Sequence, residues 1–207
     1  MAQNISPLTR QTFEDIYETP KAPWDIGRPQ SAFVEAGGHI RGRVLDIGCG
    51  TGELALWLAE KGCTVTGADF LPKPLEVARQ KAAERGLSVA FVTADAIRVH
   101  ELGGEFDAVT DCGLFHVFDA AGRAAYTSSL RNLLAPGAKV FLLCFSDAEP
   151  GTQGPRRISE SDLRAVFADG WQIETIAPAR FESVPGITGA EFTDGGAHSW
   201  FATIRRI

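Results

Sequence analysis

The chain has 207 residues, of which 44% are hydrophobic and 22% are charged, and its formal net charge is -6. This composition is that of a globular protein and excludes a disordered chain, and the negative charge works against binding to nucleic-acid phosphates or anionic lipid. The length suits one domain with a full-sized core, although two small domains would also fit it.

The N-terminal stretch MAQNISPLTR lacks the charged start and apolar core of a signal peptide, and no apolar run approaches ~20 residues. Four cysteines, at positions 49, 63, 112 and 144, are scattered without a CxxC pair. This pattern indicates reduced thiols and favours neither a disulfide framework nor a zinc site. We therefore expect a soluble cytoplasmic protein with no membrane contact and no bound metal.

An amphipathic helix is expected near the N-terminus. Ser6 and Pro7 suit a helix start, and Phe13, Ile16 and Tyr17 then fall on one helical face. The next stretch, KAPWDIGRPQ, is typical of a loop but carries a tryptophan, and a short helix is expected over 31–36.

From residue 43 onward, apolar runs of strand length alternate with runs of helical spacing. This alternation predicts right-handed βαβ units and a parallel sheet covered by helices on both faces. The expected strands are 43–48, 63–70, 88–95, 106–111 and 138–147, and the expected helices are 53–62, 74–85 and 120–134.

The pattern changes after residue 147. A turn-rich loop is followed by Ser159 and Asp162, which resemble a capping box at the start of a helix. Two closing strands are expected over 171–177 and 198–207. The long stretch between them contains several glycines and prolines, and loops of this length in compact domains are usually functional or mobile.

The segment DIGCGTG lies where the first strand turns into a helix. Glycines at positions 48, 50 and 52 let the backbone turn sharply and approach a ligand closely, as a nucleotide at the carboxyl edge of a parallel sheet requires. A tight turn without a ligand is the alternative. A dinucleotide fingerprint would run GxGxxG, and here the third glycine comes one residue early, which disfavours an NAD-dependent oxidoreductase.

Two carboxylates support a nucleotide site. Asp69 follows the second strand, where an acidic side chain can accept both hydroxyls of a ribose. Asp95 follows the third strand, where a carboxylate can accept a hydrogen bond from an adenine amino group. Each of them alone could be a helix N-cap, but together with the glycines they indicate an adenosine site.

These residues resemble those of the class I S-adenosylmethionine-dependent methyltransferases, and the similarity extends over nearly the whole chain. The resemblance implies a Rossmann-like, doubly wound α/β sheet of seven strands, mostly parallel, with the last strand antiparallel and helices on both faces. It implies S-adenosyl-L-methionine as the cofactor. The cofactor residues that it implies are Trp24, Asp46, Gly48, Cys49, Gly50, Gly52, Asp69, Phe70, Asp95, Ala96 and Asp111.

The stretch PWDIGRPQ is similar to the N-terminal segment of small-molecule methyltransferases of the thiopurine, halide and thiol type, and of a bacterial group that acts on quinones and heterocycles. The resemblance implies that residues 1–40 form a helix and lid and that residues 41–207 form the methyltransferase domain. Both parts are expected to belong to a single structural domain. Trp24 would then be an apolar part of the lid, with Asp25 and Arg28 tethering the loop or holding the cofactor. Packing of the N-terminal helix is the alternative role for Trp24.

The stretch DCGLFHVFD follows the fourth strand, at the edge where an acceptor must lie. Tyr17, Phe115, His116 and Phe181 are the candidate acceptor residues. His116 is a candidate general base. An equally good interpretation is that it is a core histidine whose ring is hydrogen-bonded to a backbone carbonyl.

The expected function is transfer of a methyl group to O, N or S of a small aromatic or heterocyclic acceptor, with a quinol or phenol favoured. A thiol or halide acceptor is the alternative. The acidic charge disfavours methylation of RNA or protein, and a non-catalytic protein that binds S-adenosylmethionine is the rival from another class. The sequence does not predict the oligomeric state.

Overall fold

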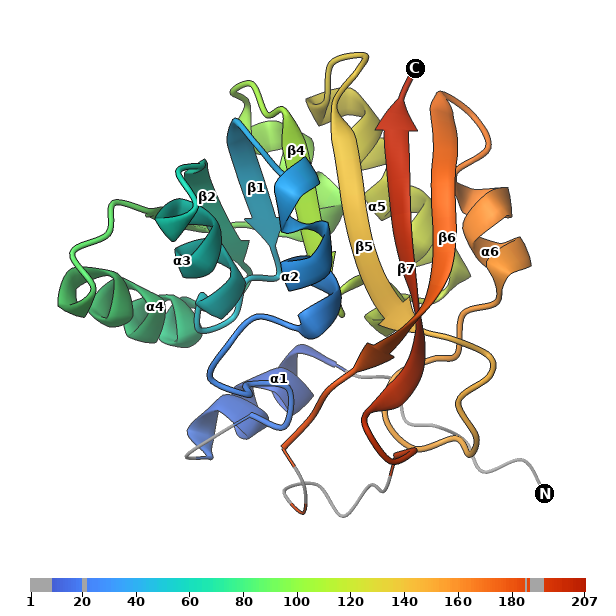
Figure 1. The fold of residues 1–207 in the computed structure, drawn as a ribbon, viewed down its shortest axis with the longest axis horizontal. Helices are drawn as coiled ribbons and strands as arrows, with labels where there is room; N and C mark the ends of the chain where they lie inside the picture. The colour runs from blue at the N-terminus through green and yellow to red at the C-terminus, as the bar shows by residue number, and fades with distance from the viewer. Residues whose placement is uncertain (1–8, 20–21, 185, 187–191) are drawn as a thin grey trace.

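The computed structural model describes residues 9–19, 22–184, 186 and 192–207. Across these residues the chain forms a seven-stranded sheet in the order β3-β2-β1-β4-β5-β7-β6 (Figure 1). The strands are β1 Arg43–Ile47, β2 Thr64–Asp69, β3 Ala90–Thr93, β4 Ala108–Cys112, β5 Lys139–Phe145, β6 Trp171–Phe181 and β7 Ala197–Arg206.

The pairings of β1 with β2 and β4, of β2 with β3 and of β4 with β5 are all parallel, and β7 runs antiparallel to both of its neighbours, β5 and β6. The predicted fold class, including the antiparallel last strand, is confirmed. The strand order reverses between β1 and β4, and the carboxyl ends of the strands beside such a point form the usual ligand crevice of a doubly wound sheet.

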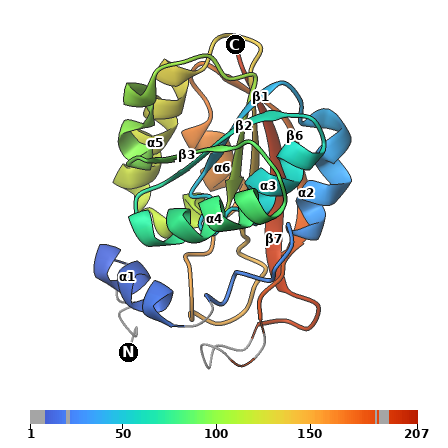
Figure 2. The same cartoon turned by 90° about the vertical axis from the view of Figure 1, so that its left-hand side faces the viewer.

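Helices cover both faces of the sheet, so the molecule has three layers (Figures 1 and 2). One face packs against α2, α3 and α4, and the other packs against α5, α6 and η2. The short α1 lies apart from these layers, below the carboxyl ends of the parallel strands (Figure 1). The helices are α1 Arg10–Glu18, α2 Ser31–Ala36, α3 Glu53–Glu60, α4 Pro72–Glu84, α5 Ala120–Leu133 and α6 Glu160–Val166, with 3-10 turns η1 Gly37–His39, η2 Ala96–Leu102 and η3 Phe115–Val117.

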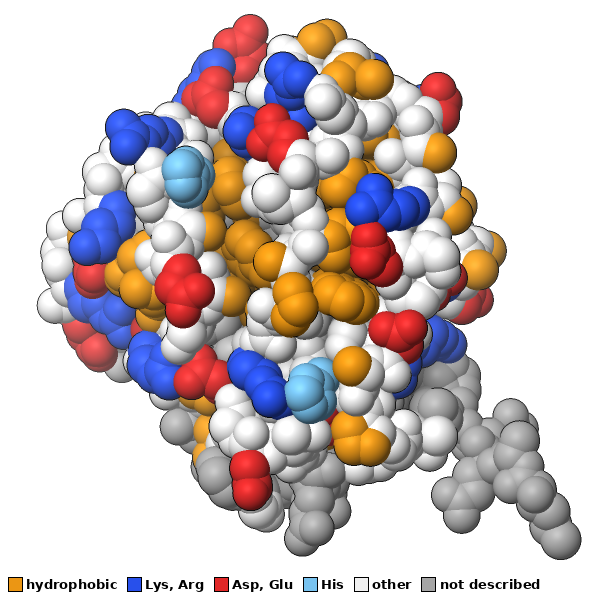
Figure 3. Space-filling model, turned by 45° about the vertical axis from the view of Figure 1, so that its right-hand side comes forward, with side chains coloured by type: hydrophobic (Ala, Val, Ile, Leu, Met, Phe, Trp, Pro, Cys, Tyr) orange, Lys and Arg blue, Asp and Glu red, His pale blue; other side chains and the backbone are white. Residues whose placement is uncertain are grey.

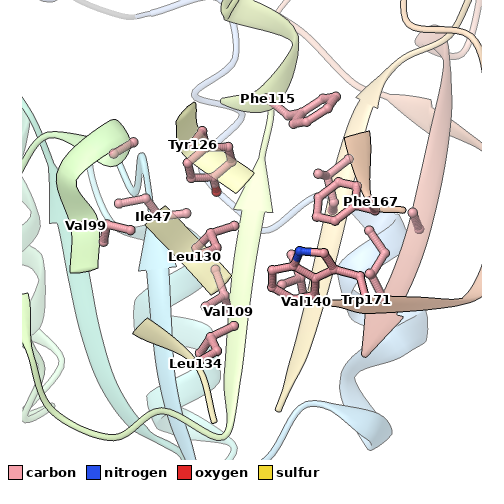
Figure 4. Close-up of a cluster of buried hydrophobic side chains, with 14 of the residues drawn as sticks. Ile47, Val99, Val109, Phe115, Tyr126, Leu130, Leu134, Val140, Phe167 and Trp171 are labelled. Atoms are coloured by element: carbon pink, nitrogen blue, oxygen red, sulfur yellow. The ribbon is translucent and has the colours of Figure 1, made fainter. Parts of the chain in front are cut away.

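The core between the sheet and α5 is continuous from η2 to α6. Tyr126 and Leu130 of α5 are fully buried against the central strands, and Phe167 stacks on Phe115 with ring centroids 5.9 Å apart (Figure 4). Burial of these side chains is the main source of stability for this layer, because apolar surface removed from water stabilises the fold roughly in proportion to its area.

Most element boundaries differ from the expectation by one or two residues, and those of α1 and β6 differ by more. The helix start predicted at Ser6 and Pro7 lies outside the described residues, and α1 begins at Arg10 with Thr9 as its N-cap. The strand β6 continues past the predicted end at residue 177 to Phe181, and so it includes Pro178. A proline is tolerated there because β6 is an edge strand, where the missing N–H faces no partner strand.

The capping box at the start of α6 is confirmed, with Ser159 and Asp162 exchanging side-chain and backbone hydrogen bonds. All four cysteines are free, and Cys144 is buried. None of the helices in the described ranges has both the length and the apolar character that a bilayer crossing needs.

The packing of the core around α5 predicts that shortening a buried side chain there strongly lowers the stability of the fold. Changing Leu130 to Ala should lower the free energy of unfolding by about 2 to 5 kcal/mol, because the fully buried side chain leaves a cavity. Urea denaturation would measure this. The exposed Asn132→Ala on the same helix is the matched control and should change stability by less than ~0.5 kcal/mol. Equal effects of the two changes would contradict this description of the core.

Candidate active site

A cavity of ≈ 790 Å³ opens at the carboxyl edge of the sheet. Its floor is formed by the turn after β1 and by the residues that end β2, β3, β4 and β5, and its roof is formed by α1 and the segment 23–30. The cavity therefore spans the edge from the predicted adenosine side to the region beyond β4 and β5, which is large enough for a nucleotide-sized ligand and a second small molecule.

The glycine turn forms the floor at β1. Gly48 and Gly50 have φ of 69° and 52°, a backbone conformation that favours glycine. A Cβ at Gly48 would lie 3.2 Å from Leu114, and one at Gly50 would lie 2.8 Å from the hydroxyl of Tyr17. The amides of Gly48 and Cys49 both donate to the carbonyl of Ala68, at 2.8 and 3.0 Å, which joins the turn to the end of β2.

Gly52 has a different role from the other two glycines. It is the N-cap of α3, and a Cβ there would lie 2.9 Å from Ala78 and 3.1 Å from Phe91. It does not line the cavity. The third glycine of the motif thus allows close packing of α3 against α4 and β3.

Asp69 lines the cavity at the end of β2 and is fixed by two backbone amides. Its Oδ2 accepts from Gly50 at 3.0 Å, and its Oδ1 accepts from Leu71 at 3.0 Å. Burial raises the pKa of this carboxyl, while the amide hydrogen bonds act in the opposite direction. Both oxygens retain a lone pair, so the carboxylate can still accept hydroxyl hydrogen bonds.

Asp46 lies under the glycine turn and is almost completely buried. Its Oδ1 accepts from the hydroxyl of Thr110 at 2.8 Å, and its Oδ2 is buried without a hydrogen bond. Burial raises the pKa of Asp46 to about 7, and the hydrogen bond from Thr110 opposes this shift. An unpartnered carboxylate oxygen beside a cavity is suited to a cationic ligand.

The residues expected to border the adenine lie together at the end of β3. Asp95 caps η2 by accepting from the amide of Ile97 at 3.1 Å, and it also lines the cavity, as Ala96 does. Phe70 completes this side and is covered by α1, where Phe13 meets its ring edge-on at 5.8 Å and Arg10 lies over it at 5.4 Å. Asp95 is therefore both a helix cap and a cavity residue.

The segment 23–30 contacts α1 on one side and the body of the protein on the other. Trp24 donates from its indole to the hydroxyl of Tyr17 at 3.3 Å, and Asp25 accepts from Thr51 at 2.6 Å. Arg28 pairs with Glu182 at 2.6 Å. Gln30 exchanges two hydrogen bonds with the backbone of Glu182, at 2.9 and 2.7 Å. Asp25 and Arg28 thus tether the segment, which is one of the two roles expected for them.

Three predicted site residues do not line the cavity, and they are Gly52, Asp111 and Phe115. Asp111 is fully buried, and its Oδ1 accepts from the amides of Leu114 and Phe115 at 2.8 and 3.2 Å. Burial raises its pKa to about 6. These hydrogen bonds hold the first turn of η3, which directs Phe115 into the core against Phe167 (Figure 4). The expectation that Phe115 contacts the acceptor and Asp111 the cofactor is not supported by this placement.

The structure also argues against His116 as a general base. Its Nδ1 accepts from the amide of Phe145 at 2.9 Å, so the proton of the neutral ring is on Nε2, which faces the backbone of Gly113. No lone pair remains to accept a proton. Burial, together with the nearby cation of Arg157, lowers the pKa of His116 to about 3. His116 lines the cavity, but as a neutral, backbone-bonded side chain.

Other cavity residues were not found from the sequence. Phe145 at the end of β5 and the loop 153–156 line the cavity, and Arg156 is one of them. Nothing local distinguishes these residues, because Phe145 belongs to an apolar strand and the loop is defined only by its turn-forming residues. Tyr17 and Phe181 do line the cavity, as expected.

Comparison with known proteins agrees with this geometry. Residues 44–137 match a family model described as a methyltransferase domain. The chain is 38% identical over 217 aligned positions to the 2-heptyl-1-hydroxyquinolin-4(1H)-one methyltransferase of Mycobacteroides abscessus, covering 99% of this chain and 92% of that protein. The chain belongs to the class I S-adenosylmethionine-dependent methyltransferases.

Solved structures place this methyltransferase in the same family. One, from work on the conversion of a disulfide bond into a thioacetal group during echinomycin biosynthesis, is 37% identical with a TM-score of 0.84, and the match covers 96% of this chain and 93% of the other. Magnesium protoporphyrin IX methyltransferase from Synechocystis PCC 6803, with bound S-adenosylmethionine, is 25% identical with a TM-score of 0.63, over 86% of this chain and 76% of that one. The predictions of enzyme class and cofactor are confirmed.

The residues of this methyltransferase fit S-adenosylmethionine. The glycine turn leaves a cradle that side chains would fill, Asp69 presents a carboxylate at the end of β2, and the free oxygen of Asp46 is available to a cation. We expect Asp69 to hold the ribose, Asp95 and Ala96 to border the adenine, and Asp46 to face the positively charged methionine end. When bound, this cofactor supplies an electrophilic methyl group on a sulfonium.

The raised pKa of Asp46 predicts that cofactor affinity depends on pH. A cation binds the ionised carboxylate, so affinity should be constant above pH 7 and should fall by up to about tenfold per pH unit below it. Calorimetric titration between about pH 5.5 and 8.5 would measure this. Asp46→Asn should bind more weakly at high pH and lose the dependence. Asp169→Asn, beyond the opposite end of the sheet, is the control, and the same slope in Asp46→Asn would contradict the assignment.

Proposed function

We propose that this methyltransferase acts on O, N or S of a small aromatic or heterocyclic acceptor, with a quinol-like or phenol-like hydroxyl favoured. The observation that carries the proposal is the aromatic end of the cavity, which we define as Phe118, Phe145, Phe181 and Phe192. The ring of Phe145 meets Phe181 at 5.4 Å and Phe192 at 5.2 Å, both edge-on. Flat aromatic molecules pack favourably against such rings.

The aromatic end lies where an acceptor has to be. The adenosine residues follow β2 and β3, on one side of β1, whereas the aromatic end follows β4, β5 and β6, on the other side. A methyl group presented over β1 and β4 would therefore point toward these rings. This arrangement supports a planar apolar acceptor in direct contact with the reacting methyl group.

The relatives favour an oxygen acceptor and keep a sulfur acceptor as the second candidate. The 2-heptyl-1-hydroxyquinolin-4(1H)-one methyltransferase, by its name, acts on a hydroxylated heterocycle, and the likeness extends over almost the whole of both chains. The structure from echinomycin biosynthesis concerns the conversion of a disulfide into a thioacetal, which supports a thiol or thioether as the alternative.

Surface charge supports a small acceptor over a nucleic acid. The face that carries β6 and α6 shows positive and negative side chains interspersed around a central hydrophobic area (Figure 3). The net charge of the chain is -6. Binding to a phosphate backbone depends on clustered cations, and this face shows no cluster of Lys and Arg side chains free of interspersed acidic ones.

We infer that α1 and the segment 23–30 act as a lid over both ligands. Tyr17 and Trp24 border the glycine turn, and the tether to Glu182 brings the segment to the aromatic end. A closed roof excludes water, which favours a reaction between a cationic methyl donor and an electron-rich acceptor whose opposite charges are neutralised. The alternative is that Trp24 only packs α1 onto the domain, in which case it would have no part in turnover.

Methyl transfer from labelled S-adenosylmethionine would test the function across phenols, quinols, azaheterocycles, thiols and halides, with RNA as a control. We expect the highest transfer to aromatic hydroxyls. Transfer to RNA alone would overturn the small-molecule proposal, and tight cofactor binding without transfer to any acceptor would favour a non-catalytic cofactor-binding protein.

The lid predicts a kinetic effect for loss of its tether. Changing Glu182 to Gln should reduce turnover by roughly 3- to 10-fold, because a partly buried charged hydrogen-bond network is worth about 1 kcal/mol or more and each 1.36 kcal/mol is tenfold in rate. Glu174→Gln on β6, the strand that ends just before Glu182, removes a comparable ion pair, with Lys139, away from the cavity, and is the matched control. Equal turnover of both variants would remove the lid role.

A further inference from the structure

We propose that this enzyme methylates acceptors that arrive already ionised, and that Arg156 determines this specificity by holding the anion at the aromatic end. This inference rests on the proposed function and narrows its substrate class to acidic hydroxyls or thiols. It follows from two features of the cavity wall: the described side chains near the acceptor provide no free basic nitrogen, and one cation there has no carboxylate partner among the residues that the structure describes.

The first feature is the state of His116. It is the one histidine among the described cavity residues, and its acceptor nitrogen is occupied by the amide of Phe145. Each carboxylate that lines the cavity also accepts at least one hydrogen bond from another group of the protein, and the two that keep free acceptor capacity, Asp46 and Asp69, lie on the cofactor side. The hydrogen-bonded pairs are Asp25 with Thr51, Asp46 with Thr110, Glu53 with Lys81, Asp69 with Gly50, Asp95 with Ile97 and Asp119 with Gly122.

The second feature is Arg156, which lines the cavity from the loop before α6. Its Nη1 donates to the carbonyl of Val117 at 2.6 Å, and its backbone amide donates to the carbonyl of His116 at 3.3 Å. Both contacts join the loop to η3. The guanidinium is therefore held beside the residues that follow β4, where the acceptor is expected.

The neighbouring Arg157 keeps this loop in place. It donates to the carbonyls of Glu149 at 3.0 Å and Pro155 at 2.7 Å, and its guanidinium lies 5.3 Å from the centre of the Phe145 ring. Glu149 in turn accepts from the amides of Thr193 and His198. The guanidinium of Arg157 thus donates its hydrogen bonds to the loop itself, whereas Arg156 lines the cavity.

Arg156 differs from the other arginines of the cavity. Arg10 pairs with Glu14 at 2.8 Å, and Arg28 pairs with Glu182 at 2.6 Å. In the described part of the chain no carboxylate lies within ion-pair distance of Arg156. A cation beside apolar rings interacts with a nearby anion more strongly than in water, so it favours the ionised form of a bound acceptor over the neutral acid.

The charged and titratable groups around the aromatic end come from three secondary-structure elements and one loop. Cys112 ends β4 as a half-buried thiol whose pKa is raised by desolvation, His116 belongs to η3, and Asp119 caps α5. Arg156 and Arg157 come from the loop before α6. Asp119 is exposed and is the nearest described carboxylate in sequence to η3, so it is the base that the test has to exclude.

The proposed step balances without a protein base. The acceptor loses its proton to water before or during entry. The acceptor anion then attacks the methyl carbon of the bound cofactor, a bond from the acceptor atom to carbon forms, and the carbon–sulfur bond breaks with its electron pair remaining on sulfur. The products are the neutral methylated acceptor and a neutral thioether, so the two opposite charges are lost together.

The test is the pH dependence of kcat/KM for ring-substituted phenols and 1-hydroxyquinolin-4(1H)-ones of graded acidity. We expect the midpoint of each profile to follow the pKa of the acceptor. A midpoint that stays fixed while the acidity of the acceptor changes would overturn the inference and leave the proposed function intact. Failure of every acceptor in the wider screen would overturn both.

Variants of Arg156 test its role directly. Arg156→Gln should raise KM for the anionic acceptors about tenfold, with unchanged cofactor affinity, and Arg156→Lys should restore part of the loss. Arg164→Gln, which removes an exposed cation of α6, is the matched control. Equal KM values for Arg156→Gln and Arg164→Gln would overturn the assignment.

Two further variants test for a hidden base. Asp119→Asn keeps the cap of α5, and Glu191→Gln changes the carboxylate that precedes Phe192 in the sequence and lies outside the described residues. We expect both to retain the acceptor-dependent midpoint. Loss of activity by about 10²-fold or more in either variant, as removal of a general base produces, would overturn the inference.

Discussion

The turn between β1 and α3 has to place backbone without side chains, at Gly48 and Gly50, at the carboxyl edge of the sheet. The rest of the site is built around that constraint. The amides of Gly48 and Cys49 bond to Ala68, and the amide of Gly50 bonds to Asp69. These contacts join the turn to the end of β2, so the turn is held in place by the sheet. A cofactor therefore meets a preformed floor, and little ordering of this wall opposes its binding.

The roof is held by contacts of another kind. Trp24 and Phe13 pack on each other at 5.8 Å, but the connections from the roof to the body of the protein are largely polar, through Asp25, Arg28 and Gln30. The half-exposed pair of Arg28 with Glu182 separates at small energetic cost, whereas the buried hydrophobic layers do not. Gln30 is buried, so its two hydrogen bonds hold the end of the segment more firmly. We expect ligands to enter under the roof without disturbing the sheet.

Burial determines the charge states along the cavity. It raises the pKa of Asp46 and Asp69 and lowers the pKa of His116, since a low-dielectric surrounding disfavours any charged form. A cationic ligand beside the two carboxylates reverses their shift. The cofactor end is thus prepared for positive charge, while the aromatic end has a neutral imidazole and the cation of Arg156.

Local chemistry explains why much of the fold was predictable. Strand and helix periodicity predicted the alternating layers, and the glycines at 48 and 50 with Asp69 and Asp95 marked the cofactor floor, because the positive φ of a glycine turn and the position of a carboxylate after a strand are local properties. The boundary of β6 was not predictable in this way. Pro178 indicates a strand end unless the strand is known to be an edge, and edge position is a property of the whole sheet.

The sequence by itself thus determined the architecture, the cofactor class and the floor of the site. Only the tertiary structure decided what the residues after β4 do. Asp111 bonds the amides of Leu114 and Phe115 and directs Phe115 into the core, His116 gives its lone pair to a strand 29 residues away, and Arg156 reaches η3 from a distant loop. Side-chain direction in a short irregular turn depends on which distant groups satisfy its hydrogen bonds, and no local pattern encodes that choice.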